Sequence, residues 1–476
     1  MASTFFGLTI AYSGLQAANT SLTITGHNVS NINTKGYTKQ QAGTQAADAL
    51  RTHTTYGAIG SGVVVTEISQ IRDSYYDVKY RNNMANYGQY SVKESYMGQI
   101  EDYLDEFTLN GYSQEYKNFF SAVNQLTITP GDTSAKNQLI NNAKSLADYF
   151  NTLTTNLRNV QADANNEIKD AVQQINSYAK NIAALNRQIN QIEANYGNAN
   201  DLRDKRNAMI DELSEIVNLE TSEEDMGNNV SNFSVRINGQ TLVSSYSYNT
   251  LETVARTDKK NYSDAEGLYD VQWNSGQKFD MYSTSLSGHL KGLIDIRDGN
   301  NGEHENIETD DDGNNVTDSD GNLVLTTAPA ADKTVSYKGV PYYQAQLNEF
   351  AKIFSDAVNK IMKSGYTSDG SSKGISLFVT QPNTTVMSAG NITVNPELLK
   401  NADLLAIKKE QNDGESDAKI MEELNKLQSE KIFAGGTGSY FLESIVSDMS
   451  IDSQKAVNLY KNYTDLKTSI HNQRLS

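Results

Sequence analysis

A stretch of 65 residues between Gly131 and Gly197 contains neither glycine nor proline, the residues that most readily end a helix. Its apolar residues recur every three or four positions, as on one face of an α-helix. The series is Leu139, Ala143, Leu146, Phe150, Leu153, Leu157, Val160, Ala164, Ile168, Val172, Ile175, Ala179, Ile182, Leu185, Ile189, Ile192 and Tyr196. A helix over this stretch would be on the order of 85 Å long. The series predicts a rod-like bundle or coiled coil, as one helix or as two that meet at a small stutter after Ala164.

Near Glu220 the apolar spacing changes to strict alternation, which is typical of strands. The alternating residues form two runs, Phe233, Val235, Ile237 and Tyr269, Val271, Trp273. The first run ends at Asn238-Gly239, a strong hairpin signal. Helical spacing returns after Pro341, which suits the first turn of a helix.

These periods predict a mainly α protein with a β insert: an elongated long-helix bundle or coiled-coil rod plus an inserted β-rich outer domain. The expected parts are residues 1–70 as an N-terminal assembly helix and extended segment, 71–221 as the first part of the rod, 222–340 as the inserted β-rich outer domain, and 341–476 as the second part of the rod.

The first forty residues carry a second helical stripe. One row at seven-residue intervals is Leu8, Leu15, Leu22 and Val29, and a row of mostly small residues beside it is Ala11, Ala18, Thr25 and Ile32. About thirty residues with so few large aliphatics cannot offset their own ordering entropy. The stripe therefore predicts an interface that is completed by another helix, and the Asn-rich run after Val29 predicts where the helix ends.

Two runs in this segment resemble the N-terminal signature of the flagellar axial proteins, the family of rod, hook and hook-associated components. The residues that carry the resemblance are Ser13, Gly14, Leu15, Asn28, Asn31, Asn33, Thr34, Gly36 and Tyr37. The run 287–298, read as a short helix inside the insert, is similar to a recurrent element of hook-associated proteins. The alternative interpretation of the first forty residues is an ordinary amphipathic helix with an Asn-rich cap.

The resemblance implies a structural subunit of the extracellular flagellum, self-assembling at the junction between hook and filament, and exported unfolded through the flagellar type III pathway without a cleaved signal peptide. It implies as partners other copies of the chain, the hook protein, a neighbouring hook-associated protein and, as an open option, an export chaperone. Alternatives are another axial subunit such as hook protein or flagellin, or a secreted adhesin or enzyme with a functional insert. No helix is expected after Arg474, so the family's usual C-terminal assembly helix is predicted to be absent: either the chain is truncated or it assembles without that helix.

Composition and charge narrow the classes of function that the chain can have. The net charge of −18 argues against nucleic-acid partners and against an anionic membrane surface, and the chain has no cysteine for disulfides or thiol chemistry. The five histidines are scattered, and no zinc, nucleophile-elbow or phosphate-loop motif is complete. An acidic run from Glu308 to Ser319 imitates a calcium loop but ends in Ser where a bidentate Glu is needed, so turns explain it better. We therefore predict a protein without catalytic residues, cofactor or metal.

Overall fold

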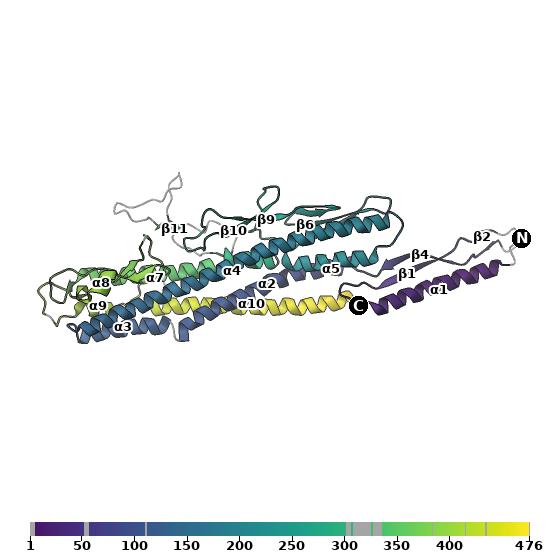
Figure 1. The fold of residues 1–476 in the computed structure, drawn as a ribbon. Coiled ribbons are helices and arrows are strands. Elements are labelled where there is room, and N and C mark those ends of the chain that lie inside the picture. The colour runs from purple at the N-terminus through teal and green to yellow at the C-terminus, as the bar shows by residue number, and fades with distance from the viewer. Residues whose placement is uncertain are drawn as a thin grey trace.

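The computed structural model describes residues 5–51, 57–109, 112–300, 306–307, 325–326, 336–382, 384–414, 416–433 and 436–475. Long helices run side by side as a rod, strands cover one flank of it, and an arm made of α1 and two long strands projects from one end (Figure 1). The acidic run that imitates a calcium loop lies outside the described residues. The predicted fold class, a helical rod with a β insert, is confirmed.

The helices within the described residues carry the rod and the arm. They are α1 (Phe6–Ser30), α2 (Ser74–Leu109), α3 (Tyr112–Ile128), α4 (Thr133–Glu193), α5 (Asn200–Ile216), α6 (His289–Arg297), α7 (Val340–Ser364), α8 (Pro396–Lys400), the 3-10 helix η1 (Ala402–Leu404), α9 (Lys419–Lys426) and α10 (Gly438–Leu475). The longest, α4, starts at the Asp132 cap, whose carboxylate accepts from the Ser134 amide. It continues unbroken through the stutter, so the one-helix alternative is the correct one.

The strands form small antiparallel sheets. They are β1 (Gln40–Ala46), β2 (Leu50–Arg51), β3 (Ala58–Ile59), β4 (Val63–Gln70), β5 (Glu220–Asp225), β6 (Ser231–Ile237), β7 (Gln240–Ser244), β8 (Ser247–Tyr248), β9 (Leu251–Ala255), β10 (Tyr269–Trp273), β11 (Asn306–Ile307), β12 (Leu325–Thr326), β13 (Tyr366–Thr367), β14 (Phe378–Thr380), β15 (Ile392–Val394) and β16 (Ala406–Lys408). Strands β5-β6-β7-β8 form the largest sheet, and β9 pairs with β10. Asn238 and Gly239 both have positive φ, as the predicted β6–β7 hairpin requires.

The predicted stripe of α4 is the spine of the core. Every member from Leu139 to Ile189 is buried, whereas Ile192 and Tyr196 are exposed, Tyr196 to 90%. The prediction that these last two residues belong to the core is wrong. Ile192 lies in the exposed last turn of α4, which ends at Glu193, and Tyr196 follows the helix in a left-handed conformation. Helices α2, α3, α5, α6 and α7 pack on α4 along the part of its stripe that is buried, from Leu139 to Ile189.

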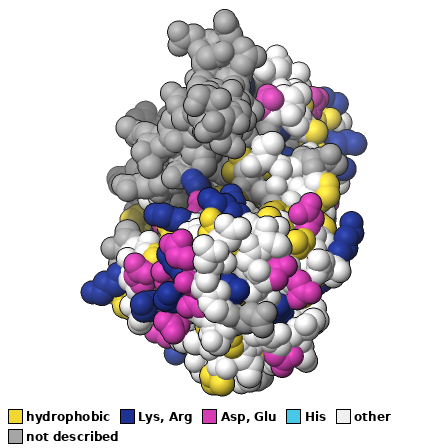
Figure 2. Space-filling view, turned by 90° about the vertical axis from the view of Figure 1, so that its left-hand side faces the viewer, with side chains coloured by type: hydrophobic (Ala, Val, Ile, Leu, Met, Phe, Trp, Pro, Cys, Tyr) yellow, Lys and Arg dark blue, Asp and Glu magenta, His cyan; other side chains and the backbone are white. Residues whose placement is uncertain are grey.

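The end of the rod that carries α3 and α9 is filled by aromatic rings. Phe350 stacks on Phe433 with 5.0 Å between ring centroids, and Phe119 meets Phe354 edge-on at 5.7 Å. Outside, Figure 2 shows Lys and Arg side chains intermingled with Asp and Glu on this end. The end is therefore a rigid, well-packed core under a solvated surface of mixed charge.

A close approach of backbones fixes the spacing of α2 and α5. A Cβ added at Gly88 of α2 would overlap the Glu215 carbonyl oxygen of α5, while one added at Gly98, ten residues along the same helix, would meet nothing within 4 Å. We expect Gly88→Ala to lower the free energy of unfolding by about 1–3 kcal/mol, because the helices must move apart. Gly98→Ala should raise it by about 0.5–1 kcal/mol through helix propensity alone. Urea denaturation of both variants measures the difference, and equal effects would contradict this packing.

A buried polar cluster fastens the insert to the rod. Arg297, at the end of α6, is fully buried, and its Nη1 donates to Asn165 Oδ1 of α4 (2.8 Å) and to the Tyr269 carbonyl of β10 (2.7 Å). Asp298 accepts from Arg297 and also from Arg256, which follows β9, at 2.6 Å from Nη2. Two arginines thus share one carboxylate where helix and sheet meet, and each buried group has a partner.

Because of this cluster, the folded protein is expected to lose stability at acid pH. Burial alone would raise the pKa of Asp298, but Arg297 and Arg256 hold the pKa well below the usual range. The unfolded chain therefore takes up this proton first, and the stability contributed by Asp298 is present above about pH 4 and lost as the pH falls below it. We expect Asp298→Asn to flatten the acid limb of a plot of unfolding midpoint against pH. The neighbouring Asp264 has the opposite effect on how stability changes with pH, because burial raises the pKa of Asp264.

Candidate assembly interface

Helix α1 exposes the predicted stripe almost completely. Exposure is 66% for Leu8, 67% for Leu15 and 70% for Leu22, and Val29 and Ile32 are exposed to a similar degree or more. Ala11 and Ala18, from the small row, are exposed as well. The opposite face buries Ala17 and Ile24, where α1 packs on β1 and β4. Six of the seven predicted interface residues, Leu8, Ala11, Leu15, Ala18, Leu22 and Val29, therefore share one solvent-facing side of α1, here called the α1 stripe. The seventh, Ile32, is exposed in the turn that follows the helix.

The family-motif residues that follow the stripe close the helix. The Asn28 carboxamide donates to the Gln40 carbonyl (2.9 Å) and accepts from the Gln40 amide (2.9 Å) and the Tyr37 hydroxyl (2.8 Å). Asn31 is the C-cap of α1, and its side chain accepts from Thr34 Oγ1 at 3.2 Å. These bonds turn the chain back so that β1 runs beside the helix it has just left.

The same turn fastens the arm to α5. Gly36 has φ +81°, and a Cβ there would lie 2.9 Å from the Ala208 Cβ of α5, so both the conformation and the close approach require glycine. Lys35 Nζ pairs with Glu212 Oε1 at 2.7 Å, and the Thr38 amide donates to Asp204 Oδ2 at 2.9 Å. The arm base is thus tied to the rod by residues 166 or more positions away in the chain.

The remaining predicted motif residues divide between two environments. Ser13 Oγ accepts from the Val63 amide (3.2 Å) and donates to the Ile10 carbonyl (2.8 Å), which seats α1 on β4. Gly14 has open space where a Cβ would be, and Leu15 is exposed beside it. Asn33 is exposed in the turn after α1. The motif therefore combines residues that build the arm with residues that stay uncovered on it.

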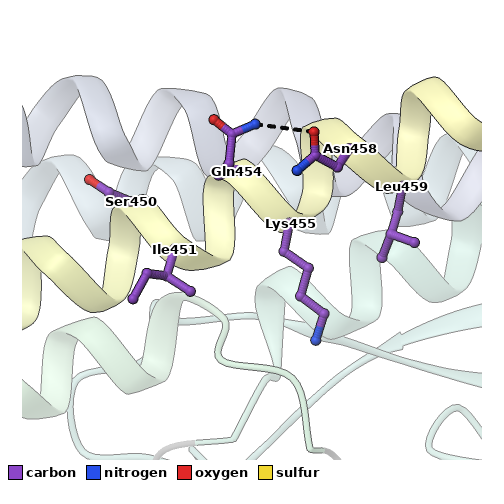
Figure 3. Close-up of a pocket in the computed structure, with 6 residues that line it drawn as sticks. All are labelled: Ser450, Ile451, Gln454, Lys455, Asn458 and Leu459. Atoms are coloured by element: carbon purple, nitrogen blue, oxygen red, sulfur yellow. Dashed lines mark hydrogen bonds between the residues drawn. The ribbon is translucent and has the colours of Figure 1, made fainter.

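A shallow hollow lies on α10, away from the α1 stripe. Ile451, Lys455 and Leu459 point to the same side of the helix, and Gln454 donates to Asn458 Oδ1 at 3.3 Å (Figure 3). All six lining residues come from this one helix. A single helix face with one cation lacks the converging polar groups that bind and convert a substrate. We assign no chemistry to this hollow.

Two further searches cover the described part of the chain. No group of three or more His, Cys, Asp or Glu side chains there is arranged to hold a metal ion. No helix in the same part is long and apolar enough to span a bilayer.

The protein is a long rod with an inserted β unit and an uncovered apolar stripe at one end, and exposed apolar patches of this kind mark interaction surfaces. Residues 97–378 match the family described as the flagellar hook-associated protein FlgK helical domain. The chain therefore belongs to this family of structural flagellar proteins.

Individual relatives agree with the family. The chain is 27% identical to flagellar hook-associated protein 1 of Bacillus subtilis over 390 residues, covering 79% of this chain and 70% of the relative. It is 33% identical to the Salmonella typhimurium protein of the same name over 219 residues, covering 46% of this chain and only 39% of that relative. The fold resembles that of the flagellar hook junction protein FlgK from Burkholderia pseudomallei, with a TM-score of 0.63 at 15% identity over 84% of this chain and 100% of the other.

Proposed function

We propose that this chain is a self-assembling structural subunit at the junction between the flagellar hook and filament. The observation that carries the proposal is the α1 stripe, whose large aliphatic side chains are about two-thirds exposed in the isolated chain. Membership of the flagellar hook-associated family and the names of the relatives from Bacillus and Salmonella support it.

The physical mechanism is burial on assembly. Each large aliphatic of the stripe is worth about 1.5–3 kcal/mol when fully buried, so covering several of them contributes several kcal/mol per subunit. That gain is absent in the free chain and is repeated at every contact between neighbours. Helical or ring stacking of many copies through such heterologous contacts converts individually weak seams into a stable tube.

We assign parts to the chain on the same basis. The arm within residues 1–70 would make the assembly contacts, the rod in 71–221 and 341–476 would set subunit spacing, and the insert in 222–340 would face outward. The partners would be further copies, the hook protein and a neighbouring hook-associated protein, with an export chaperone as an additional option. Export would follow the flagellar type III route to the extracellular flagellum, without a cleaved signal peptide. No nucleic-acid, membrane, cofactor or metal role enters this proposal.

Electron microscopy of intact flagellated cells tests the proposal, using gold-labelled antibody against residues 222–300, the continuous described part of the insert. We expect label confined to a short zone where hook meets filament. Label along the whole hook or filament would instead identify a bulk axial subunit. Absence of label from flagella would overturn the proposal and favour a secreted binder or enzyme. Cells lacking the gene provide the background control.

A further inference from the structure

Six charged side chains of alternating sign form a continuous row where the arm, α2, α5 and α10 meet. In spatial order the row, here called the ion-pair ladder, is Asp204, Arg72, Asp77, Arg474, Asp211 and Arg81. Its centre is Arg474 of α10, whose Nε lies 2.7 Å from Asp77 Oδ1 and whose Nη1 lies 2.6 Å from Asp211 Oδ2. One guanidinium therefore bridges carboxylates of two other helices.

The outer members continue the row in both directions. Arg72 Nε pairs with Asp77 Oδ2 at 2.6 Å, and Arg72 Nη1 lies 3.7 Å from Asp204 Oδ1. On the other side, Arg81 Nε pairs with Asp211 Oδ1 at 2.8 Å. All six side chains are at most 15% exposed, and the three positive charges balance the three negative ones. Losing one member therefore leaves a poorly solvated charge without compensation.

The ladder ends on the arm. Asp204 accepts from the Thr38 amide at 2.9 Å, and Arg72 Nη1 donates to Thr38 Oγ1 at 3.1 Å. Thr38 lies between the turn that closes α1 and the first residue of β1, so these bonds fix where the arm leaves the rod. Figure 1 shows the C-terminal end of α10 beside this arm base.

The end of α10 is held with little apolar burial. Between Gln454 and Arg474 the only buried residues are Ala456 and Ile470. Two aromatic pairs add directional contacts with α2: Tyr90 stacks on Tyr463 at 5.4 Å, and Tyr87 faces Tyr460 at 5.5 Å. Segments with few buried apolar contacts are the ones that open locally at low cost. Arg474 is thus a large part of what closes this seam.

We propose that the ion-pair ladder couples the base of the arm to the end of α10, so that docking of the α10 end strengthens the hold of the rod on the arm. When the end of α10 undocks, Arg474 no longer lies between Asp77 and Asp211, and the two carboxylates repel each other. Asp77 then has only Arg72 as a cationic partner, and Asp211 has only Arg81. The hold of Arg72 on Thr38 and Asp204 weakens as a result. The ion-pair ladder and the α1 stripe have separate roles. The stripe supplies the contact with neighbouring subunits, and the ladder helps to fix the orientation of the arm that carries the stripe.

Residue-resolved hydrogen exchange on the full chain tests the coupling at the Thr38 amide. We expect Arg474→Gln to raise Thr38 exchange at least about fivefold, the lower range of typical couplings between sites. The Gln40 amide is the internal reference, because it bonds to Asn28 within the arm and should not change. Lys467→Gln is the matched control: it removes a cation from the same helix that lies 3.9 Å over the Tyr87 ring, outside the ladder.

The proposal is overturned if Thr38 exchange is unchanged in Arg474→Gln, or if Lys467→Gln raises it equally. Should Arg474→Gln fail to fold, Asp204→Asn decides, since it keeps an acceptor for Thr38 but removes the charge facing Arg72. Coupling is reciprocal, so that variant should speed exchange in the last turn of α10. Unchanged exchange there would refute the ladder. None of these readouts depends on flagellar assembly, so they succeed or fail independently of the proposed function.

Discussion

Replacing Leu15 by Asp is expected to abolish incorporation of the chain into flagella while the rod stays folded. Leu15 is 67% exposed, so the isolated subunit loses little apolar burial, and a surface change of this kind costs about 0.5 kcal/mol or less. In the assembled state a carboxylate would have to enter an apolar seam, where an uncompensated charge costs several kcal/mol. Immunogold counts on flagella, set against far-UV circular dichroism of the purified monomer, measure the two effects separately.

The matched control is Gln16→Glu. It adds the same charge to the neighbouring exposed position, which an α-helix places about 100° around its axis and so outside the α1 stripe. Incorporation should survive in this variant. Two results would refute the division of labour between stripe and rod: a large loss of helical signal in the Leu15→Asp monomer, or normal incorporation of that variant.

Features that depend on local period were predictable from the sequence. The steps of three and four in α4 identified its buried face up to Ile189, because one helix face is repeated along a straight element. Asn238-Gly239 identified the β6–β7 hairpin, since both residues must adopt positive φ. The same reasoning failed at Ile192 and Tyr196, where the apolar period outlasts the helix and says nothing about what covers its last turn.

Contacts between distant segments were not predictable in this way. The charged residues of the ion-pair ladder lie in three separate stretches of the sequence, at 72–81, 204–211 and 474. Only the fold brings Asp204 to Thr38, which is 166 positions earlier, and Arg474 to Asp77 and Asp211. Periodicity specifies which side of a helix is covered, whereas pairing of buried charges depends on the packing of whole elements.

Arg297 is the residue whose loss should destabilise the junction of rod and insert most. It sits within the run 287–298, predicted only as a short helix, yet its guanidinium is fully buried against Asp298, Asn165 and the Tyr269 carbonyl. We expect Arg297→Met to lower the free energy of unfolding by about 3–5 kcal/mol, because Asp298 keeps only Arg256 as a cationic partner and the Tyr269 carbonyl loses the Arg297 donor. Asn165 Oδ1 also loses Arg297 but keeps the Tyr269 amide as a donor. Urea denaturation followed by fluorescence reports on this, since the single tryptophan, Trp273, is buried in β10, the strand whose first residue, Tyr269, accepts from Arg297.

Two comparisons separate the buried charge from general damage to the interface. Arg158→Met removes an arginine that also joins α4 to the insert, through the Ser263 carbonyl at 3.1 Å, but this side chain is partly exposed and should cost about 1 kcal/mol or less. The double variant Arg297→Met/Asp298→Asn should cost less than the sum of the two single losses, because the Arg297–Asp298 interaction can be lost only once. Equal effects of the two arginine variants, or a double variant with the full sum of both losses, would mean that shape rather than charge pairing holds the insert on the rod.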